Sequence, residues 1–88
     1  MQTRVITFHG GEIGSDGVPK QFHRYFVVAS LAPMLGRKAS VASIMALTSA
    51  PEPAVSHFVV QDGSEAEAIE KAVAALEALP ANRGLQKY

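Results

Sequence analysis

The chain contains no cysteine. This absence excludes disulfides, thiolate metal sites, iron–sulfur clusters and cysteine nucleophiles. A chain of 88 residues buries only roughly 60–65% of the surface that it exposes when unfolded. Without covalent cross-links, its stability must therefore come from packing or from a partner.

Long hydrophobic runs are also missing. The longest uncharged stretches, Tyr25–Gly36 and Ala39–Pro51, fall short of the roughly 20 residues that a membrane-spanning helix needs. The N-terminal segment Met1–Val5 has no basic stretch leading into an apolar region, so it does not resemble a signal peptide. We therefore expect a cytoplasmic protein without a membrane segment.

The composition is that of one globular domain. Apolar residues make up 48% of the chain, charged residues 18%, and the net charge is zero, whereas a disordered chain would be less apolar and further from neutrality. We predict a single α+β domain over residues 1–80 and an irregular tail over residues 81–88. Basic residues gather in the N-terminal half and acidic residues in the C-terminal half.

The C-terminal region predicts an amphipathic helix from about Glu65 to Leu79. Ser64 and Glu67 form the S-x-x-E pattern of a capping box at its start, and Pro80 follows its end. Apolar residues recur at steps of three and four, which indicates one buried stripe. These residues are Ile69, Ala72, Val73, Leu76 and Leu79.

Three segments upstream read as strands: Gln2–Phe8, Phe22–Leu31 and Ser56–Val60. The first two are separated by the glycine-rich stretch His9–Gly17, which we expect to be a long connection with residues of positive φ. Only Gln61-Asp62-Gly63 lies between the last strand and the Ser64 cap. This short connection should fold the helix back onto the sheet.

The segment Ala39–Thr48 fits two periodicities. Val41, Ile44, Met45 and Thr48 would form a helical stripe, but the segment is short and alternates equally well as a strand. We favour a strand that pairs with Phe22–Leu31. The predicted fold is an α+β antiparallel sheet of three to four strands with one C-terminal amphipathic helix packed on one face, in the order β-β-β-β-α, with β-β-α-β-α as the alternative.

The strand Phe22–Leu31 is apolar on both faces. Tyr25, Val27 and Ala29 alternate with Phe26 and Val28, whereas a strand with one wet face alternates apolar with polar residues. One helix can cover only one face of such a sheet. We therefore expect the second face to be covered by a partner, most simply by a second copy of the chain.

Motifs for catalysis or phosphate binding are absent. The glycines of Gly11-x-x-Gly14-x-x-Gly17 match neither a dinucleotide-binding fingerprint nor a Walker loop, and no lysine followed by serine or threonine comes after them. The serines include none in a G-x-S-x-G elbow. We predict no catalytic residues, no enzymatic activity and no cofactor.

Metal binding is also disfavoured. His9, His23 and His57 lack the i,i+4 spacing of helical zinc sites, and there is no cysteine to complete a zinc finger. We interpret them as hydrogen-bonded structural residues and predict no metal site. A small-ligand or metal-binding regulatory domain would instead need a cavity near His23 or His57.

Basic and aromatic residues interleave near the middle of the chain. Stacking on aromatic side chains next to cations is how sheets bind single-stranded nucleic acid, but a nucleic-acid-binding domain is usually more basic than this chain. The candidate residues for nucleic-acid or ligand binding are Lys20, His23, Arg24, Arg37 and Lys38. For nucleic acid, Arg24, Arg37 and Lys38 would have to gather on one exposed face.

The sequence therefore predicts a small non-enzymatic binding or protein-interaction module that forms a homodimer. A protein partner of another kind is compatible with the same surface. The alternatives are a weak nucleic-acid-binding domain that uses the basic and aromatic sheet face, and the small-ligand or metal-binding regulatory domain.

Overall fold

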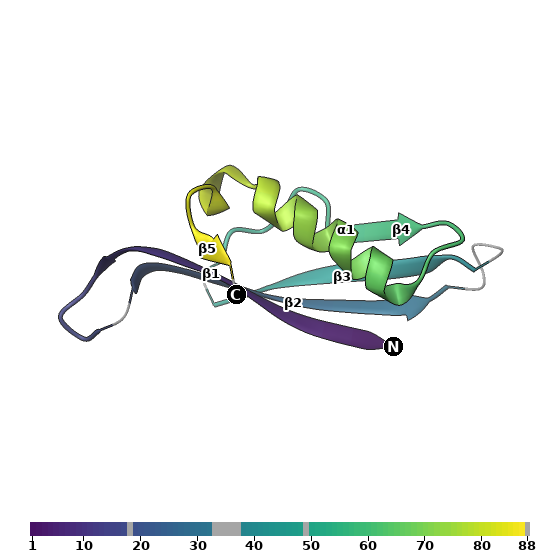
Figure 1. The fold of residues 1–88 in the computed structure, drawn as a ribbon, viewed down its shortest axis with the longest axis horizontal. Coiled ribbons are helices and arrows are strands. Elements are labelled where there is room, and N and C mark those ends of the chain that lie inside the picture. The colour runs from purple at the N-terminus through teal and green to yellow at the C-terminus, as the bar shows by residue number, and fades with distance from the viewer. Residues whose placement is uncertain (18, 33–37, 49, 88) are drawn as a thin grey trace.

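A computed structural model describes residues 1–17, 19–32, 38–48 and 50–87, without the side chains of residues 19 and 20. It contains one antiparallel sheet and one C-terminal α-helix (Figure 1). The elements in chain order are β1 (Gln2–Ile13), β2 (Pro19–Leu31), β3 (Ser40–Leu47), β4 (His57–Val60), α1 (Glu65–Ala78), the 3-10 helix η2 (Pro80–Asn82) and β5 (Gln86–Lys87).

The strands lie in the order β4-β3-β2-β1-β5. Strands β1 to β4 follow one another as antiparallel neighbours, with Val5 opposite Phe26 and Phe26 opposite Met45. The predicted α+β class and the packing of the helix on the sheet are confirmed, and the segment over residues 39–48 contains a strand. The sheet has five strands, more than the three to four expected, because the tail adds β5.

The β1–β2 hairpin is longer than the sequence indicated. Strand β1 continues past the expected end at Phe8 into the glycine-rich stretch, as far as Ile13, and β2 begins at Pro19, three residues before the expected start at Phe22. The pairing register between the two strands shifts between Gly10 and Ile13, as it does at a β-bulge. The tip closes through Gly17 N–H, which donates to Gly14 O over 3.0 Å, with Gly17 at φ 79°. The end of the hairpin projects well beyond the helix (Figure 1).

Helix α1 begins where the capping pattern predicts. The hydroxyl of Ser64 accepts a hydrogen bond of 3.2 Å from the backbone N–H of Glu67. Such a cap stabilises a helix by about 1 kcal/mol. An ion pair of 2.7 Å between Arg4 of β1 and Glu70 adds an exposed link to the sheet.

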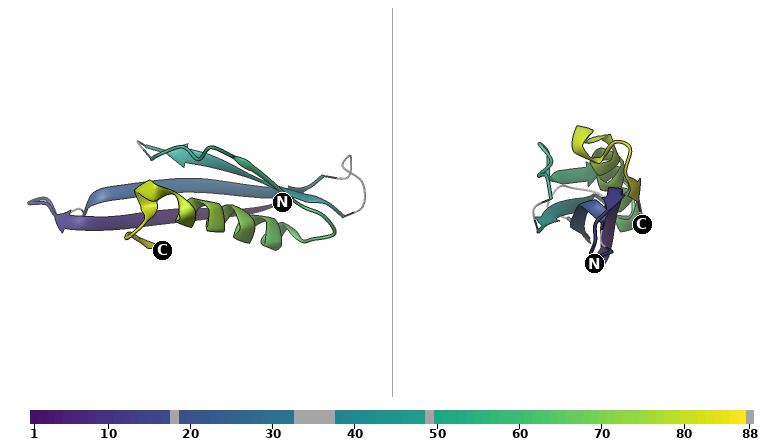
Figure 2. Two further views of the ribbon diagram at one scale, coloured as in Figure 1. Left: turned by 90° about the horizontal axis from the view of Figure 1, so that it is seen from above. Right: turned by 90° about the vertical axis from the view of Figure 1, so that its left-hand side faces the viewer.

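The hydrophobic core lies between α1 and one face of the sheet. Strand residues of even number in β1 and of odd number in β2 point toward the helix, because opposite partners share a face. Four residues of the predicted helix stripe, Ile69, Ala72, Val73 and Leu76, are buried there, and the fifth, Leu79, follows the helix and is half-buried. The largest fully buried side chains of the core are Tyr25, Phe8, Ile69, Leu76 and Val27. Figure 2 shows the helix on one side of a curled sheet.

Up to Lys87, where the described chain ends, the tail forms a 3-10 helix and a short strand, although we expected it to be irregular. After η2, strand β5 pairs with Phe8 and His9 of β1. Leu85 lies so close to Gly10 that a Cβ added there would be 2.7 Å from Leu85 Cδ2. The Leu85 side chain therefore packs directly against the backbone at Gly10, and a larger residue there would displace its end. Lys87 also forms an ion pair with Glu77 of the helix.

Within the described part of the chain, no helix is long and apolar enough to cross a membrane.

Candidate functional site

The most distinctive surface is the face of the sheet that α1 does not cover, which we call the open face. It is formed by residues of odd number in β1 and β3 and of even number in β2. At its centre, Val5 is 52% exposed and Met45 is 61% exposed. Phe22, toward the hairpin, is also exposed, and the half-buried apolar residues of this face are Phe26, Val28, Val41, Leu47 and, in β4, Val59. Four neighbouring strands therefore present apolar side chains with no layer above them.

Arg24 of β2 also lies on this face. Its guanidinium lies 4.9 Å from the centre of the Phe22 ring, and its Nε donates to Thr7 Oγ1 over 3.4 Å. A cation over an aromatic ring is weakly attracted by the ring quadrupole. These contacts hold Arg24 along the sheet, at the side of the apolar area nearest the projecting hairpin.

A buried polar network lies on the opposite face, below the end of the helix. Asn82 is 2% exposed. Its Nδ2 donates to Leu76 O over 2.9 Å and to the Tyr25 hydroxyl over 3.2 Å. The Tyr25 hydroxyl in turn donates to Pro51 O over 2.9 Å. The network joins β2, the end of α1, η2 and the loop before β4.

The same network assigns the tautomer of His23. Leu76 O can only accept, so the amide nitrogen of Asn82 must face it and Asn82 Oδ1 must face His23. The distance from His23 Nδ1 to Asn82 Oδ1 is 2.7 Å, so Nδ1 carries the proton and donates. His23 is therefore a hydrogen-bonded structural residue in this fold.

Burial also affects the titration of Tyr25. Desolvation raises the pKa of the Tyr25 phenol above its ordinary value of 10.0, and the hydrogen bond from Asn82 partly opposes this rise. The neutral phenol is thus the stable form in the core. It donates a hydrogen bond to Pro51 O, which an ionised phenolate could not do.

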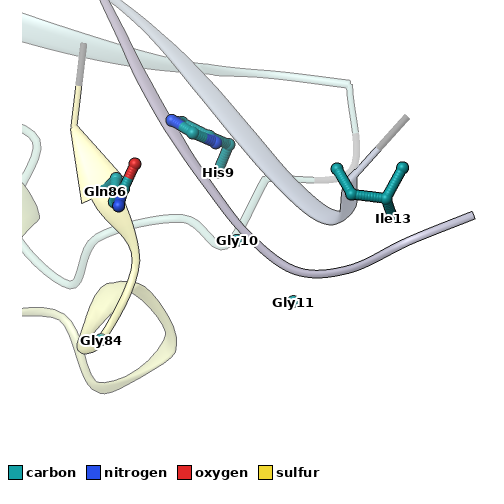
Figure 3. A pocket seen from close by; sticks show the side chains of 6 residues that line it. All are labelled: His9, Gly10, Gly11, Ile13, Gly84 and Gln86. Carbon is teal, nitrogen blue, oxygen red and sulfur yellow. The ribbon is translucent and has the colours of Figure 1, made fainter. Parts of the chain in front are cut away.

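A cavity of about 340 Å³ opens at the base of the projecting hairpin, beside the tail (Figure 3). Its lining residues come from β1 and from the tail, and they are His9, Gly10, Gly11, Ile13, Gly84 and Gln86. Only His9 and Gln86 contribute polar side chains. Ligand sites normally combine an apolar lining with several convergent polar groups, and this cavity lacks that combination.

The residues predicted for binding do not form one cluster. Arg24 lies opposite Leu47, whereas Lys38 is exposed just before β3, whose first residue is paired with Leu31. Seven residues of strand, or roughly 23 Å, separate the two ends. Arg37 and the side chain of Lys20 lie outside the described part of the structure. His23 points to the helix side, away from the face that holds Arg24.

The three histidines are also spread over the sheet. His9 lies opposite Phe22 in the hairpin, His23 bonds to Asn82, and His57 Nδ1 is 3.2 Å from Ser56 Oγ in β4. The described residues include no group of three His, Cys, Asp or Glu side chains that could hold a metal ion. The cavity at the hairpin involves His9, and neither His23 nor His57 lines it.

Sequence reasoning missed the Tyr25–Asn82 network. Its members are up to 57 residues apart, and Asn82 between Pro80 and Gly84 reads as an ordinary turn residue. A buried tyrosine on the helix side needs a hydrogen-bond partner, which is the one signal that could have pointed to a polar group from the tail.

Comparison with models of known protein families, with curated proteins and with solved structures gives no match.

Proposed function

We propose that the chain is a non-enzymatic interaction module that acts as a homodimer, with the open faces of two copies packed against each other. The observation that carries the proposal is the exposure of Val5 and Met45 at the centre of an apolar four-strand surface. Action in the cytoplasm stays a prediction from the sequence, as does the binding of other protein partners.

The size of the open face supports a dimer. Four strands at about 4.8 Å spacing and seven residues at about 3.3 Å each give roughly 19 Å by 23 Å. Because side chains stand up from this area, two copies would bury on the order of 1,000 Å², the lower limit for a specific interface. Two such sheets would lie about 10 Å apart, as in a sandwich.

The charge of the open face is also compatible with a second copy. Arg24 lies beside the apolar centre and is already bound to Phe22 and Thr7 of its own chain. Around the apolar centre, the polar side chains are Thr3 opposite Val28, Ser43, and His57 opposite Ser43 at the β4 edge. Packing the two centres together would therefore not require burying an unpaired charge, which is the main cost of a poor interface.

Sedimentation equilibrium of the full chain at high micromolar concentration tests the proposal. The wild type should have the mass of a dimer, and Met45→Lys should be a monomer because it places a charge in the interface. Ala74→Lys, on the exposed side of α1, is the matched control and should remain a dimer. A monomeric wild type, or a Met45→Lys variant that remains a dimer, would refute the proposed interface.

A further inference from the structure

The outer edge of β4 has backbone groups that no neighbouring strand uses. Ile44 N–H donates to Ser56 O over 2.9 Å. Since bonding residues alternate along an antiparallel ladder, Phe58 and Val60 bond to β3. His57 and Val59 therefore direct their N–H and C=O groups away from the sheet.

Only one of these outward groups has a partner among the described residues. Lys71 Nζ of α1 donates to Val59 O over 3.2 Å. The His57 N–H and C=O and the Val59 N–H have no hydrogen bond within the described chain. A free strand edge is a template for pairing with another extended segment.

An apolar groove of about 300 Å³ lies beside this edge, on the helix side of the sheet. One wall is the loop Pro53–Val55, in which Val55 is 58% exposed, and the floor includes Phe58. The other wall is the end of α1, where the small residues Ala75 and Ala78 leave space next to Leu79. No charged residue lines the groove.

The helix presents a cation next to the groove. Lys71, Ala75 and Ala78 lie at i, i+4 and i+7, so they share the face of α1 that borders β4. Helix α1 follows β4 after a short turn and runs in the opposite direction. A strand added antiparallel to β4 would therefore pass Lys71 first and the two alanines next.

We propose that the β4 edge and its groove bind an extended segment of another protein by strand addition. The free backbone groups of His57 and Val59 specify an extended occupant, because a helix has no free groups to pair with them. The segment carries an acidic residue followed two positions later by a bulky apolar residue. Residues two apart on a strand share a face, so both side chains point toward α1.

Charge complementarity sets the acidic position. When a backbone N–H of the added strand donates a hydrogen bond to Val59 O, it replaces the ammonium of Lys71, which then has no acceptor. A carboxylate opposite Val60 then replaces that acceptor. The apolar residue two positions later lies opposite Phe58 and enters the groove between Val55 and Ala78. This site is on the helix side of the sheet, so it does not depend on the open-face dimer.

Nuclear magnetic resonance of the ¹⁵N-labelled full chain with two synthetic peptides tests this site. The probe is acetyl-TTETFTTT-amide, and the control acetyl-TTEFTTTT-amide has the same composition but turns its phenylalanine to the opposite side. The probe should cause saturable shifts of the His57, Val59 and Ala78 amides at about 1 mM peptide. Binding of the control should be at least ten-fold weaker.

Two variants separate the parts of the site. Ala78→Gln, at an exposed position, fills the groove and should abolish the shifts while the rest of the spectrum is unchanged. Lys71→Met keeps the side-chain stem and should remove the preference for this probe over its glutamine analogue. The proposal is wrong if neither peptide causes saturable shifts, if both bind equally, or if the shifts map to Val5, Phe26 and Met45 at the centre of the open face. A glutamate preference that survives in Lys71→Met would overturn the assigned role of Lys71.

Discussion

The two faces of the sheet differ in what covers them, although β2 is apolar on both. On the helix side, Tyr25, Val27 and Ala29 are fully buried under α1. On the open face, Phe26 and Val28 are half-buried at most, and Met45 beside them is 61% exposed. The helix side therefore contains the hydrophobic core of the chain, while the open face leaves apolar side chains in contact with solvent.

The largest expected effect of a single substitution is on the helix side, at Asn82. Asn82→Ala leaves Leu76 O and the Tyr25 hydroxyl without their donor and opens a small cavity, so we expect a loss of about 3 kcal/mol in the free energy of unfolding. Urea denaturation measures the loss. The neighbouring exposed Arg83→Ala is the control and should change stability by less than about 0.5 kcal/mol. Equal effects at the two positions would show that the network is not formed.

Alanine substitutions of the adjacent residues Val27 and Val28 test how much each face of β2 contributes to the free energy of unfolding. Both are measured in the Met45→Lys background, in which the proposed dimer should not form and only contacts within one chain contribute to stability. There, Val27→Ala should lower the free energy of unfolding by about 2 kcal/mol because it removes buried methyl groups and leaves a cavity. Val28→Ala should cost less than about 1 kcal/mol because its side chain is partly in water already. If the two variants unfold at the same urea concentration, the faces do not differ as described.

Tyr25→Phe tests the buried phenol, with an expected cost of about 1–2 kcal/mol from the lost hydrogen bonds to Pro51 and Asn82. Burial raises the pKa of Tyr25 in the folded state, so above about pH 10 the unfolded chain releases this proton first. The stabilisation by Tyr25 is complete below that pH and is lost as the pH rises through the folded-state pKa. The difference between wild type and variant should be constant at neutral pH and shrink in alkali; a difference that grows in alkali would contradict the raised pKa.

The smallest effect should occur at the start of the helix. Ser64→Ala removes the hydroxyl that accepts from Glu67 N–H, and we expect a loss of about 1 kcal/mol. Ser64→Asp should retain most of the stability, because its carboxylate accepts the same bond. Thermal unfolding followed by circular dichroism measures both variants. If alanine and aspartate behave alike, the cap does not contribute.

Local patterns were sufficient to predict much of this fold. The helix was predicted from the Ser64 cap, the 3.6-residue stripe and Pro80. Its predicted end at Leu79 is one residue beyond the observed end at Ala78. The alternation over residues 39–48 was ambiguous, but the favoured strand is the one that forms. The apolar character of both β2 faces was also visible in the sequence, because odd- and even-numbered residues of a strand, such as Tyr25 and Phe26, point to opposite faces.

Long-range contacts account for what the sequence did not reveal. The hairpin continues beyond Phe8 because Gly10 pairs with Gln21 and Ile13 pairs with Pro19 of β2. Strand β5 pairs with Phe8 and His9 of β1, and Leu85 before it packs over Gly10, 75 positions away in the chain. The candidate site was only partly predictable for the same reason. His23 was correctly interpreted as a hydrogen-bonded residue, but its partner Asn82 was not foreseen, and Arg24 does not lie beside Lys38.

Isotope-filtered nuclear Overhauser spectra of a mixture of labelled and unlabelled chains address the open face most directly. We expect intermolecular contacts from the methyl group of Met45 to methyl groups of Val5, Val28 or Val41 in the second copy. Spectra of a fully associated sample without such contacts, or with contacts only from residues on the helix side, would contradict a dimer built on the open face.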